Sequence, residues 1–182
     1  MRVLITGKPG IGKTTVIKKV INGIPDRTCG FYTEDYRDIS GKRKGFRIFT
    51  TDGLSHILAE KGFRSKFKVG SYGIDVEGFE KIVIPLLERC MEKREKILVI
   101  DEIGKMELFS KRFADLIKSI FRDEKRDIIA TVPIKDVHPV VRWIKNLPDT
   151  VVISLNSSNR DEVPDRIIDI FQRSSSQSFD KS

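Results

Sequence analysis

Short apolar runs separated by polar stretches organise most of this chain. Four of the runs are rich in β-branched residues and do not alternate with polar positions: Val3–Ile5, Ile97–Ile100, Ile128–Ala130 and Val151–Ile153. Uninterrupted runs of this kind are typical of strands that are buried on both faces. They predict a largely parallel sheet that is covered on each side.

Between these runs, apolar residues recur at the i, i+3, i+4, i+7 spacing of an amphipathic helix. The segments with this spacing are Val16–Ile21, Phe79–Met91 and Phe113–Phe121. Pro85 lies inside the second segment, so we expect a kink or a break there, because proline cannot donate a backbone hydrogen bond. Strands that alternate with helices predict an α/β fold.

The C-terminal part predicts one more helix and then a tail. Asn159 can cap a helix, with Glu162 three residues later reaching back to it, and apolar positions continue to Phe171. The serine-rich residues 174–182 predict a flexible tail. A chain of 182 residues of which 39% are hydrophobic is the right size for one domain, which we place at residues 1–173.

The segment from Cys29 to Leu58 has a different pattern. Its aromatic and β-branched residues are interrupted by turn signals at Ser40-Gly41 and Asp52-Gly53. This pattern predicts an antiparallel meander, inserted at about residues 29–70 after the first helix.

The same segment carries most of the positive charge. The formal net charge is +8, and between Arg37 and Lys68 nine basic residues stand against three acidic ones, an excess of six. Such a concentration suggests an acidic partner such as nucleic acid, and it also fits a solvated basic face on a protein from a thermophile. The scarcity of Asn and Gln beside abundant Lys, Arg and Glu favours a thermophilic source.

Two features address location and cysteine chemistry. The chain has no apolar run of the roughly 18 residues that span a bilayer, and a glycine-rich loop follows the N-terminus directly, so we expect a cytoplasmic monomer that does not bind membranes. Cys29 and Cys90 lie outside any Cys-x-x-Cys or Cys/His cluster. We therefore expect reduced structural thiols rather than a disulfide or a zinc site.

The glycine-rich loop has the GxxxxGK[ST] spacing of a phosphate-binding loop, with a predicted strand before it and a helix after it. Its glycines allow backbone amides to point at phosphates, Lys13 brings a cation to the β- and γ-phosphates, and Thr14 offers a hydroxyl to Mg²⁺. The predicted nucleotide-binding residues here are Gly7, Lys8, Pro9, Gly10, Ile11, Gly12, Lys13, Thr14 and Thr15.

An acidic pair ends the strand Ile97–Ile100. Asp101 is the predicted metal-site carboxylate, since Mg²⁺ in such sites is shared between the loop hydroxyl and an acid on a neighbouring strand. Glu102 is the predicted general base that activates a water. The residues also fit Asp-x-x-Gly, with Gly104 sensing the γ-phosphate as in GTPases, but the chain lacks the Asn/Thr-Lys-x-Asp motif that reads guanine.

A general base at Glu102 calls for a further strand between the first strand and the Asp101 strand. Ile128–Thr131 suits this position. Thr131 is then a candidate catalytic residue that contacts the γ-phosphate or the water, and it is equally well explained as a threonine at the edge of the core.

Five segments combine in a more specific way: Gly7–Thr15, Gly30–Glu34, Gly45-Phe46, Ile100–Glu107 and Asn159-Arg160. Together they resemble the cancer-related nucleoside-triphosphatase family, which is known from thermophilic microbes and from animals. The resemblance covers nearly the whole chain, and its most specific parts are IDEIGKMEL and GFYTE.

The resemblance implies a P-loop NTPase fold: a three-layer sandwich with a mostly parallel, RecA-like sheet of core order 5-1-4-3-2. It also implies a slow Mg²⁺-dependent hydrolase of several nucleoside triphosphates (ATP, GTP, CTP, UTP and TTP). Asn159 and Arg160 open the region after the last strand, where P-loop folds hold the base, and they are candidate base contacts.

Two other functions accept the same nucleotide site. A kinase would need an acceptor pocket and a lid, and the basic insertion could supply either. A nucleic-acid-dependent ATPase would use the charge around Lys42–Lys44 and Arg64–Lys68. An internal arginine finger is a further option, for which the sequence offers Arg37, Arg43, Arg47 and Arg64 without choosing among them.

Overall fold

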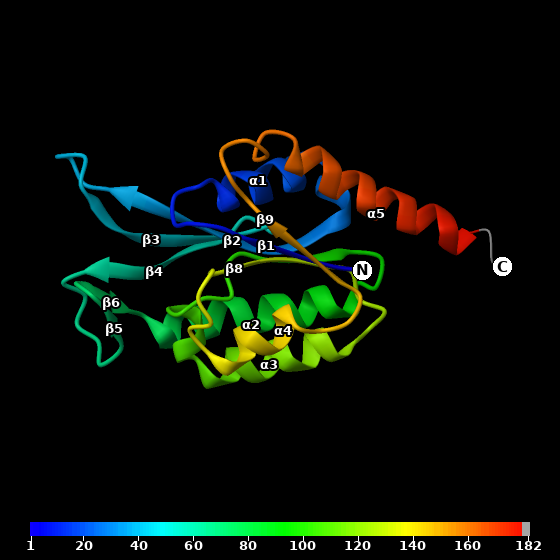
Figure 1. The fold of residues 1–182 in the computed structure, drawn as a ribbon. Helices are drawn as coiled ribbons and strands as arrows, with labels where there is room; N and C mark the ends of the chain where they lie inside the picture. Colours follow the sequence, from blue (N-terminus) through cyan, green and yellow to red (C-terminus); the bar gives the residue numbers. More distant parts are fainter. Residues whose placement is uncertain (180–182) are drawn as a thin grey trace.

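The computed structural model describes residues 1–179, which form an α/β fold around one nine-stranded sheet (Figure 1). The strand order is β5-β6-β4-β3-β2-β7-β8-β1-β9. The strands are β1 (Arg2–Thr6), β2 (Thr28–Arg37), β3 (Arg43–Thr50), β4 (Ser55–Lys61), β5 (Lys68–Val69), β6 (Tyr72–Ile74), β7 (Ile97–Ile100), β8 (Ile128–Val132) and β9 (Thr150–Ser154).

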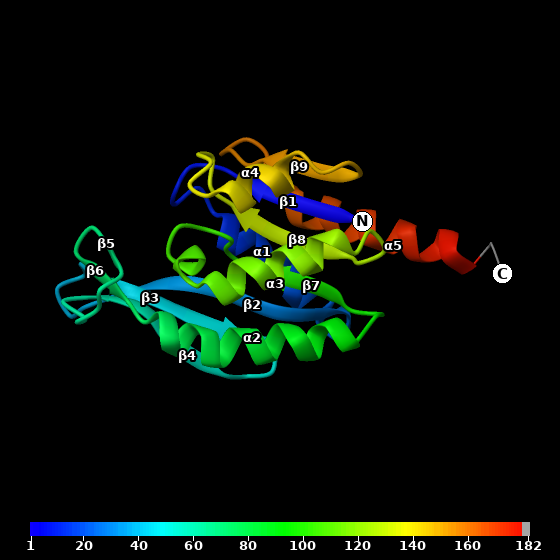
Figure 2. The ribbon, with the colours of Figure 1, turned by 90° about the horizontal axis from the view of Figure 1, so that it is seen from below.

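Helices cover the two faces of the sheet and make three layers. α1 and α5 lie on one face, and α2, α3 and α4 lie on the other (Figures 1 and 2). Each face has its own apolar core, because the strand residues alternate between the two. The helices are α1 (Lys13–Gly23), α2 (Val76–Glu92), α3 (Lys111–Arg122), α4 (Pro139–Lys145) and α5 (Val163–Phe179), with short 3-10 turns at Pro25–Arg27 and Glu107–Phe109.

The parallel part of the sheet has the predicted topology. β9, β1, β8, β7 and β2 are neighbours in that order and pair in parallel. When these five strands are numbered along the chain, the order is 5-1-4-3-2, so the fold expected from the sequence is confirmed. β8 lies between β1 and β7, as a polar contribution from Thr131 requires.

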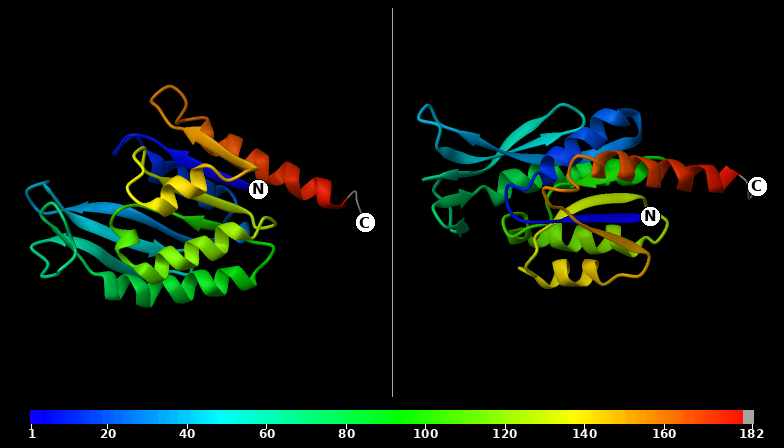
Figure 3. Two further views of the ribbon diagram at one scale, coloured as in Figure 1. Left: turned by 60° about the horizontal axis from the view of Figure 1, so that its bottom comes forward. Right: turned by 45° about the horizontal axis from the view of Figure 1, so that its top comes forward.

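β2 belongs to both the parallel core and the meander. Thr28–Phe31 pairs in parallel with β7, and Phe31–Arg37 pairs antiparallel with β3. The close approach to β7 needs a glycine, because a Cβ on Gly30 would lie 1.9 Å from the carbonyl oxygen of Val99. The predicted meander is therefore a continuation of the main sheet, and it projects past the carboxyl ends of the parallel strands (Figures 1 and 3).

The expected break at Pro85 does not occur. α2 continues through Pro85 from Val76 to Glu92. Pro85 is exposed, whereas Phe79, Val83 and Leu87 are buried in the core. The missing backbone bond lies on the solvent side, where water can take its place, while packing holds the other side of the helix together.

The two predictions for the C-terminus also change. α5 begins at Val163 rather than near Asn159, and it extends to Phe179, where the sequence predicted a flexible tail from residue 174 onward. Residues 180–182 of that predicted tail lie outside the described residues.

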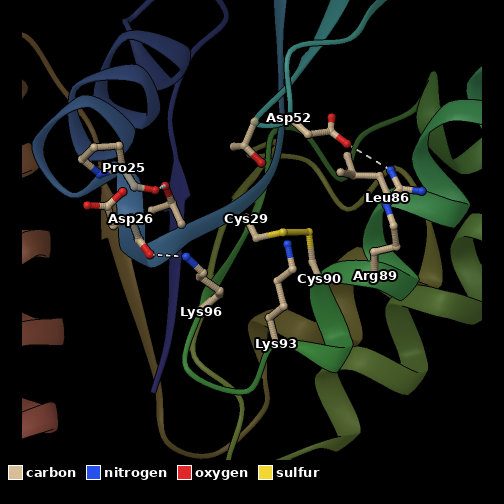
Figure 4. A pocket seen from close by; sticks show the side chains of 11 residues that line it. Pro25, Asp26, Cys29, Asp52, Leu86, Arg89, Cys90, Lys93 and Lys96 are labelled. Carbon is tan, nitrogen blue, oxygen red and sulfur yellow. Dashed lines mark hydrogen bonds and ion pairs between the residues drawn. A yellow bond between two sulfur atoms is a disulfide. The ribbon is translucent and has the colours of Figure 1, made fainter.

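The expectation of two reduced cysteines is wrong. Cys29 on β2 and Cys90 on α2 form a disulfide, with an S–S distance of 2.00 Å and a Cα–Cα distance of 5.6 Å (Figure 4). The bond lines a pocket together with Arg89, Lys93 and Lys96. Sequence spacing could not reveal the pair, because the two cysteines are 61 positions apart and the chain forms the meander and most of α2 before it returns.

The disulfide should contribute substantially to stability. Cross-linking two residues 61 positions apart restricts the unfolded chain, which in the loop-closure account is worth about 4 kcal/mol. We expect Cys29→Ala/Cys90→Ala to lower the free energy of unfolding by about that amount, and therefore to lower the guanidinium concentration at the unfolding midpoint. Addition of a thiol reductant should lower the midpoint of the unsubstituted protein but leave that of the double variant unchanged; equal midpoints with and without reductant in the unsubstituted protein would contradict the cross-link.

Candidate functional site

The loop between β1 and α1 forms a cradle. Two of its three glycines are required by their backbone angles and the third by the lack of space for a side chain. Gly10 and Gly12 have φ angles of 80° and 112°, in the left-handed region that side chains disfavour. A Cβ on Gly7 would lie 2.9 Å from Cγ2 of Ile11 and 3.0 Å from the carbonyl oxygen of Leu155. The cradle closes only with glycine at these positions.

Lys13 begins α1 and extends its side chain back into the cradle. Its Nζ donates a hydrogen bond to the carbonyl oxygen of Gly7 at 2.7 Å and lies 4.0 Å from Oε2 of Glu102. The N-terminus of α1 faces the same loop, and a helix N-terminus favours anions. Backbone amides, helix and cation thus converge on one volume suited to phosphate.

Asp101 lies at the carboxyl end of β7 and is the centre of a hydrogen-bond network. Its Oδ2 accepts from the hydroxyl of Thr14 at 2.8 Å and from the backbone N–H of Thr33 at 3.2 Å. Its Oδ1 accepts from the hydroxyl of Thr131 at 2.5 Å. Burial raises the pKa of Asp101, and these three hydrogen bonds act in the opposite direction.

Thr131 is therefore brought to the site by its contact with Asp101. It is the penultimate residue of β8, the strand between β1 and β7, and its side chain is fully buried. The sequence left its role open between a site residue and a threonine at the edge of the core. In the described structure its hydroxyl donates a hydrogen bond to the carboxylate of Asp101, the predicted metal ligand.

Thr33 was not predicted as a site residue. Besides the backbone contact to Oδ2, its hydroxyl donates to the main-chain oxygen of Asp101 at 2.8 Å, and its own carbonyl accepts from the hydroxyl of Thr14 at 3.2 Å. It reaches the site because β2 continues past the end of β7. The only sequence signal was its place in the GFYTE segment.

Glu102 directly follows Asp101, and the pKa of its carboxyl group is raised. Burial raises its pKa to about 7, against the attraction of Lys13, which lowers the pKa, and with a smaller increase from the charge of Asp101. A Cβ on Gly104 would lie 2.3 Å from Oε1 of Glu102, so the glycine leaves room for the carboxyl group.

Glu107 is a second buried acid that sequence reasoning did not select. It is 4% exposed, and its Oε2 accepts a hydrogen bond from the backbone N–H of Gly104 at 3.2 Å. Burial raises the pKa of Glu107 well above its usual value, and the charge of Glu102 raises it further. The amide of Gly104, the glycine of the Asp-x-x-Gly pattern, thus donates to Glu107 in this structure.

The loop between β9 and α5 brings Arg160 to the cradle. Its Nη1 donates to the carbonyl oxygen of Ile11 at 3.3 Å. Asn159 does not cap a helix as expected: its Oδ1 accepts from the backbone N–H of Asn156 at 2.9 Å, and its Nδ2 donates to the carbonyl of Ser154 at 2.9 Å. The side chain is thus committed to the loop, which explains why α5 starts later.

The candidate finger arginines are engaged elsewhere. Arg37 and Arg43 both approach Asp35, at 3.6 and 3.1 Å, and Arg47 lies 5.5 Å from the ring centroid of Tyr36. Within residues 1–179, no hydrogen bond or ion pair links these three, or Arg64, to Asp101, Glu102 or the cradle.

The residues that could hold a metal are oxygen donors. No group of three or more His, Cys, Asp or Glu side chains in the described part of the chain is arranged to bind one. Mg²⁺ does not need such a group, because it is commonly held by one or two protein oxygens together with phosphates and waters. The hydroxyl of Thr14 and the carboxylate of Asp101 fit that requirement.

A glycine-rich loop between the first strand and helix, an acid at the end of a nearby strand, and the order 5-1-4-3-2 define a P-loop NTPase fold. A family model described as "NTPase" matches residues 2–168. The chain therefore belongs to this NTPase family.

Individual relatives agree over nearly the full length. The nucleoside-triphosphatase THEP1 of Aquifex aeolicus is 48% identical over 178 residues, which cover 95% of this chain and all of that protein. The human cancer-related nucleoside-triphosphatase is 34% identical and covers 94% of this chain, which spans 97% of it. The crystal structure of THEP1 from Aquifex aeolicus is similar with a TM-score of 0.88 and 46% identity, over 93% of this chain and 98% of that one.

Among residues 1–179, no helix combines the length and the apolar character needed to cross a bilayer.

Replacing Thr33 should reduce turnover through Asp101. Thr33→Val keeps the backbone N–H bond but removes the hydroxyl that donates to the main chain of Asp101, a loss of about 1 kcal/mol for one hydrogen bond, or about five-fold. We expect turnover to fall by about that factor while nucleotide affinity is retained, as measured by phosphate release and equilibrium binding. Thr150→Val, at the other end of the sheet, is the control, and an equal effect there would argue against a specific role.

Replacing Glu107 should change how stability depends on pH. The pKa of Glu107 is raised in the folded protein, so the folded state holds its proton more tightly, and this contribution to stability is lost as the pH rises above the unfolded value of 4.5. Glu107→Gln has no proton to lose and can still accept from Gly104. As the pH rises from 5 to 9, we expect the melting temperature of Glu107→Gln to increase relative to that of the unsubstituted protein. A difference between the two melting temperatures that does not change with pH would contradict the raised pKa.

Proposed function

We propose that this nucleoside-triphosphatase cleaves the bond between the β- and γ-phosphates of several nucleoside triphosphates (ATP, GTP, CTP, UTP and TTP), slowly and with Mg²⁺. The products are the diphosphate and inorganic phosphate. The observation that carries the proposal is the convergence of Lys13, Asp101 and Glu102 at the mouth of the glycine-rich cradle. The absence of a guanine-reading motif from the sequence supports a broad range of bases.

Binding falls to the loop and α1. The amides of Gly7–Gly12 and the Nζ of Lys13 would contact the phosphates, and Lys13 is already held in the cradle by its bond to Gly7. Asn159 and Arg160 would border the base, and the position of Arg160 beside Ile11 supports this assignment.

Thr14 and Asp101 are the proposed metal ligands. Oγ1 of Thr14 and Oδ2 of Asp101 are 2.8 Å apart, and the hydroxyls of Thr131 and Thr33 hold the aspartate in place. When bound, Mg²⁺ would offset the negative charge of the phosphate oxygens. The residues themselves keep the aspartate oriented.

Glu102 is the proposed general base. As the oxygen of a water forms a bond to the γ-phosphorus, the carboxylate of Glu102 takes a proton from that water, and the bond from the γ-phosphorus to the diphosphate oxygen breaks. A pKa of about 7, raised by burial, gives the carboxylate a higher proton affinity than an exposed glutamate has. Thr131 would act beside it, on Asp101 and on the water or the γ-phosphate.

Glu102→Gln separates binding from chemistry. The amide keeps the shape of the side chain but cannot accept the proton, so we expect nucleotide affinity to be retained while phosphate release falls about 100-fold or more. Glu77→Gln, an exposed acid on α2, should match the unsubstituted enzyme. Phosphate release without any acceptor distinguishes hydrolysis from a kinase reaction, and unchanged turnover in Glu102→Gln would refute the assignment of the base.

A further inference from the structure

The connection between β4 and β5 alternates basic and aromatic residues. Residues 61–68 read Lys-Gly-Phe-Arg-Ser-Lys-Phe-Lys, with four cations, two phenylalanines and no acid. We call these residues the basic arm. The basic arm projects past the carboxyl edge of the parallel strands, as does the turn between β2 and β3 (Figures 1 and 3).

The basic arm forms no close ion pair within the described part of the chain, although Lys61 interacts electrostatically with Asp38. Within residues 1–179, none of Lys61, Arg64, Lys66 and Lys68 forms an ion pair, whereas Lys44 on the neighbouring strand pairs with Glu60. Lys61 and Lys66 lie instead 5.7 and 5.3 Å from the ring centroids of Tyr72 and Phe67. These four side chains are exposed, so their charge is available to a partner.

An apolar ring is exposed among these charges. Phe63 is 43% exposed, next to Arg64 and two residues from Lys61. A stacking surface between cations is the combination that proteins use for single-stranded nucleic acids, in which the cations contact phosphates and the ring takes an unpaired base. An acidic polypeptide would satisfy the cations but offers no flat base for the ring.

The other end of the basic arm is packed against the 3-10 turn Glu107–Phe109, which follows the loop that carries Glu102. The ring of Phe67 lies 5.3 Å, centroid to centroid, from Phe109, which ends the 3-10 turn that begins at Glu107. The carbonyl of Phe67 also accepts from the backbone N–H of Ile74 at 2.9 Å. A ligand on the basic arm would therefore lie close to the loop that carries Glu102 and Glu107.

We propose that the basic arm binds single-stranded nucleic acid without reading its sequence: Lys61, Arg64, Lys66 and Lys68 contact successive phosphates, and Phe63 stacks on a base. Lys42, on the turn between β2 and β3 that projects at the same edge of the sheet, is also exposed. The surface is separate from the triphosphate cradle and does not depend on the proposed hydrolysis.

The test is the binding of a fluorescein-labelled 20-nucleotide oligo(dT) or oligo(U), followed by anisotropy from 50 to 300 mM salt. We expect affinity to fall steeply with salt, since binding to several phosphates releases counterions. Arg64→Glu/Lys66→Glu should weaken binding at least ten-fold at 50 mM salt. Lys125→Glu/Arg173→Glu makes the same change in net charge at exposed positions outside the basic arm, between α3 and β8 and on α5, and should change the affinity less than two-fold.

Phe63→Ala distinguishes a nucleic acid from other polyanions. We expect it to weaken oligonucleotide binding several-fold while binding of inorganic polyphosphate is unchanged, because only a base can stack on the ring. The proposal is overturned if the unsubstituted protein binds neither strand at 50 mM salt, if the two charge-reversal variants lose affinity equally, or if Phe63→Ala affects both ligands alike or neither.

Discussion

The described structure is organised around the carboxylate of Asp101. Three threonines from three different elements hold it: Thr14 from α1, Thr33 from β2 and Thr131 from β8. Burying a carboxylate is costly unless its oxygens are hydrogen-bonded, and here two of the bonds come from β2 and β8, which flank β7 in the sheet, and the third from α1. The arrangement of the site therefore depends on the order of the parallel strands.

The sequence predicted what local pattern determines. The buried strands followed from uninterrupted apolar runs, and the cradle followed from the spacing of Gly7, Gly12 and Lys13. Asp101 could be assigned because it follows a buried strand. These features depend on residues that are close together in the chain.

Features that depend on the packing of distant residues could not be predicted. The Cys29–Cys90 bond requires β2 and α2 to be neighbours, and the contact of Thr33 requires β2 to continue beyond β7. Asn159 has the composition of a helix cap, but its amide is used within its own loop, and Pro85 is tolerated because it faces water. The sequence favoured reduced cysteines, a cap at Asn159 and a break at Pro85, and the contacts of the folded chain decided otherwise.

The double membership of β2 has a mechanical consequence. The first half of the strand is paired with β7 and joined to α2 by the disulfide. The second half is paired with β3 and belongs to the projecting hairpin. Thr33 lies two residues beyond Phe31, the last residue of β2 that is paired with β7. A movement of the hairpin relative to the parallel core would therefore displace Thr33, which is hydrogen-bonded to Asp101.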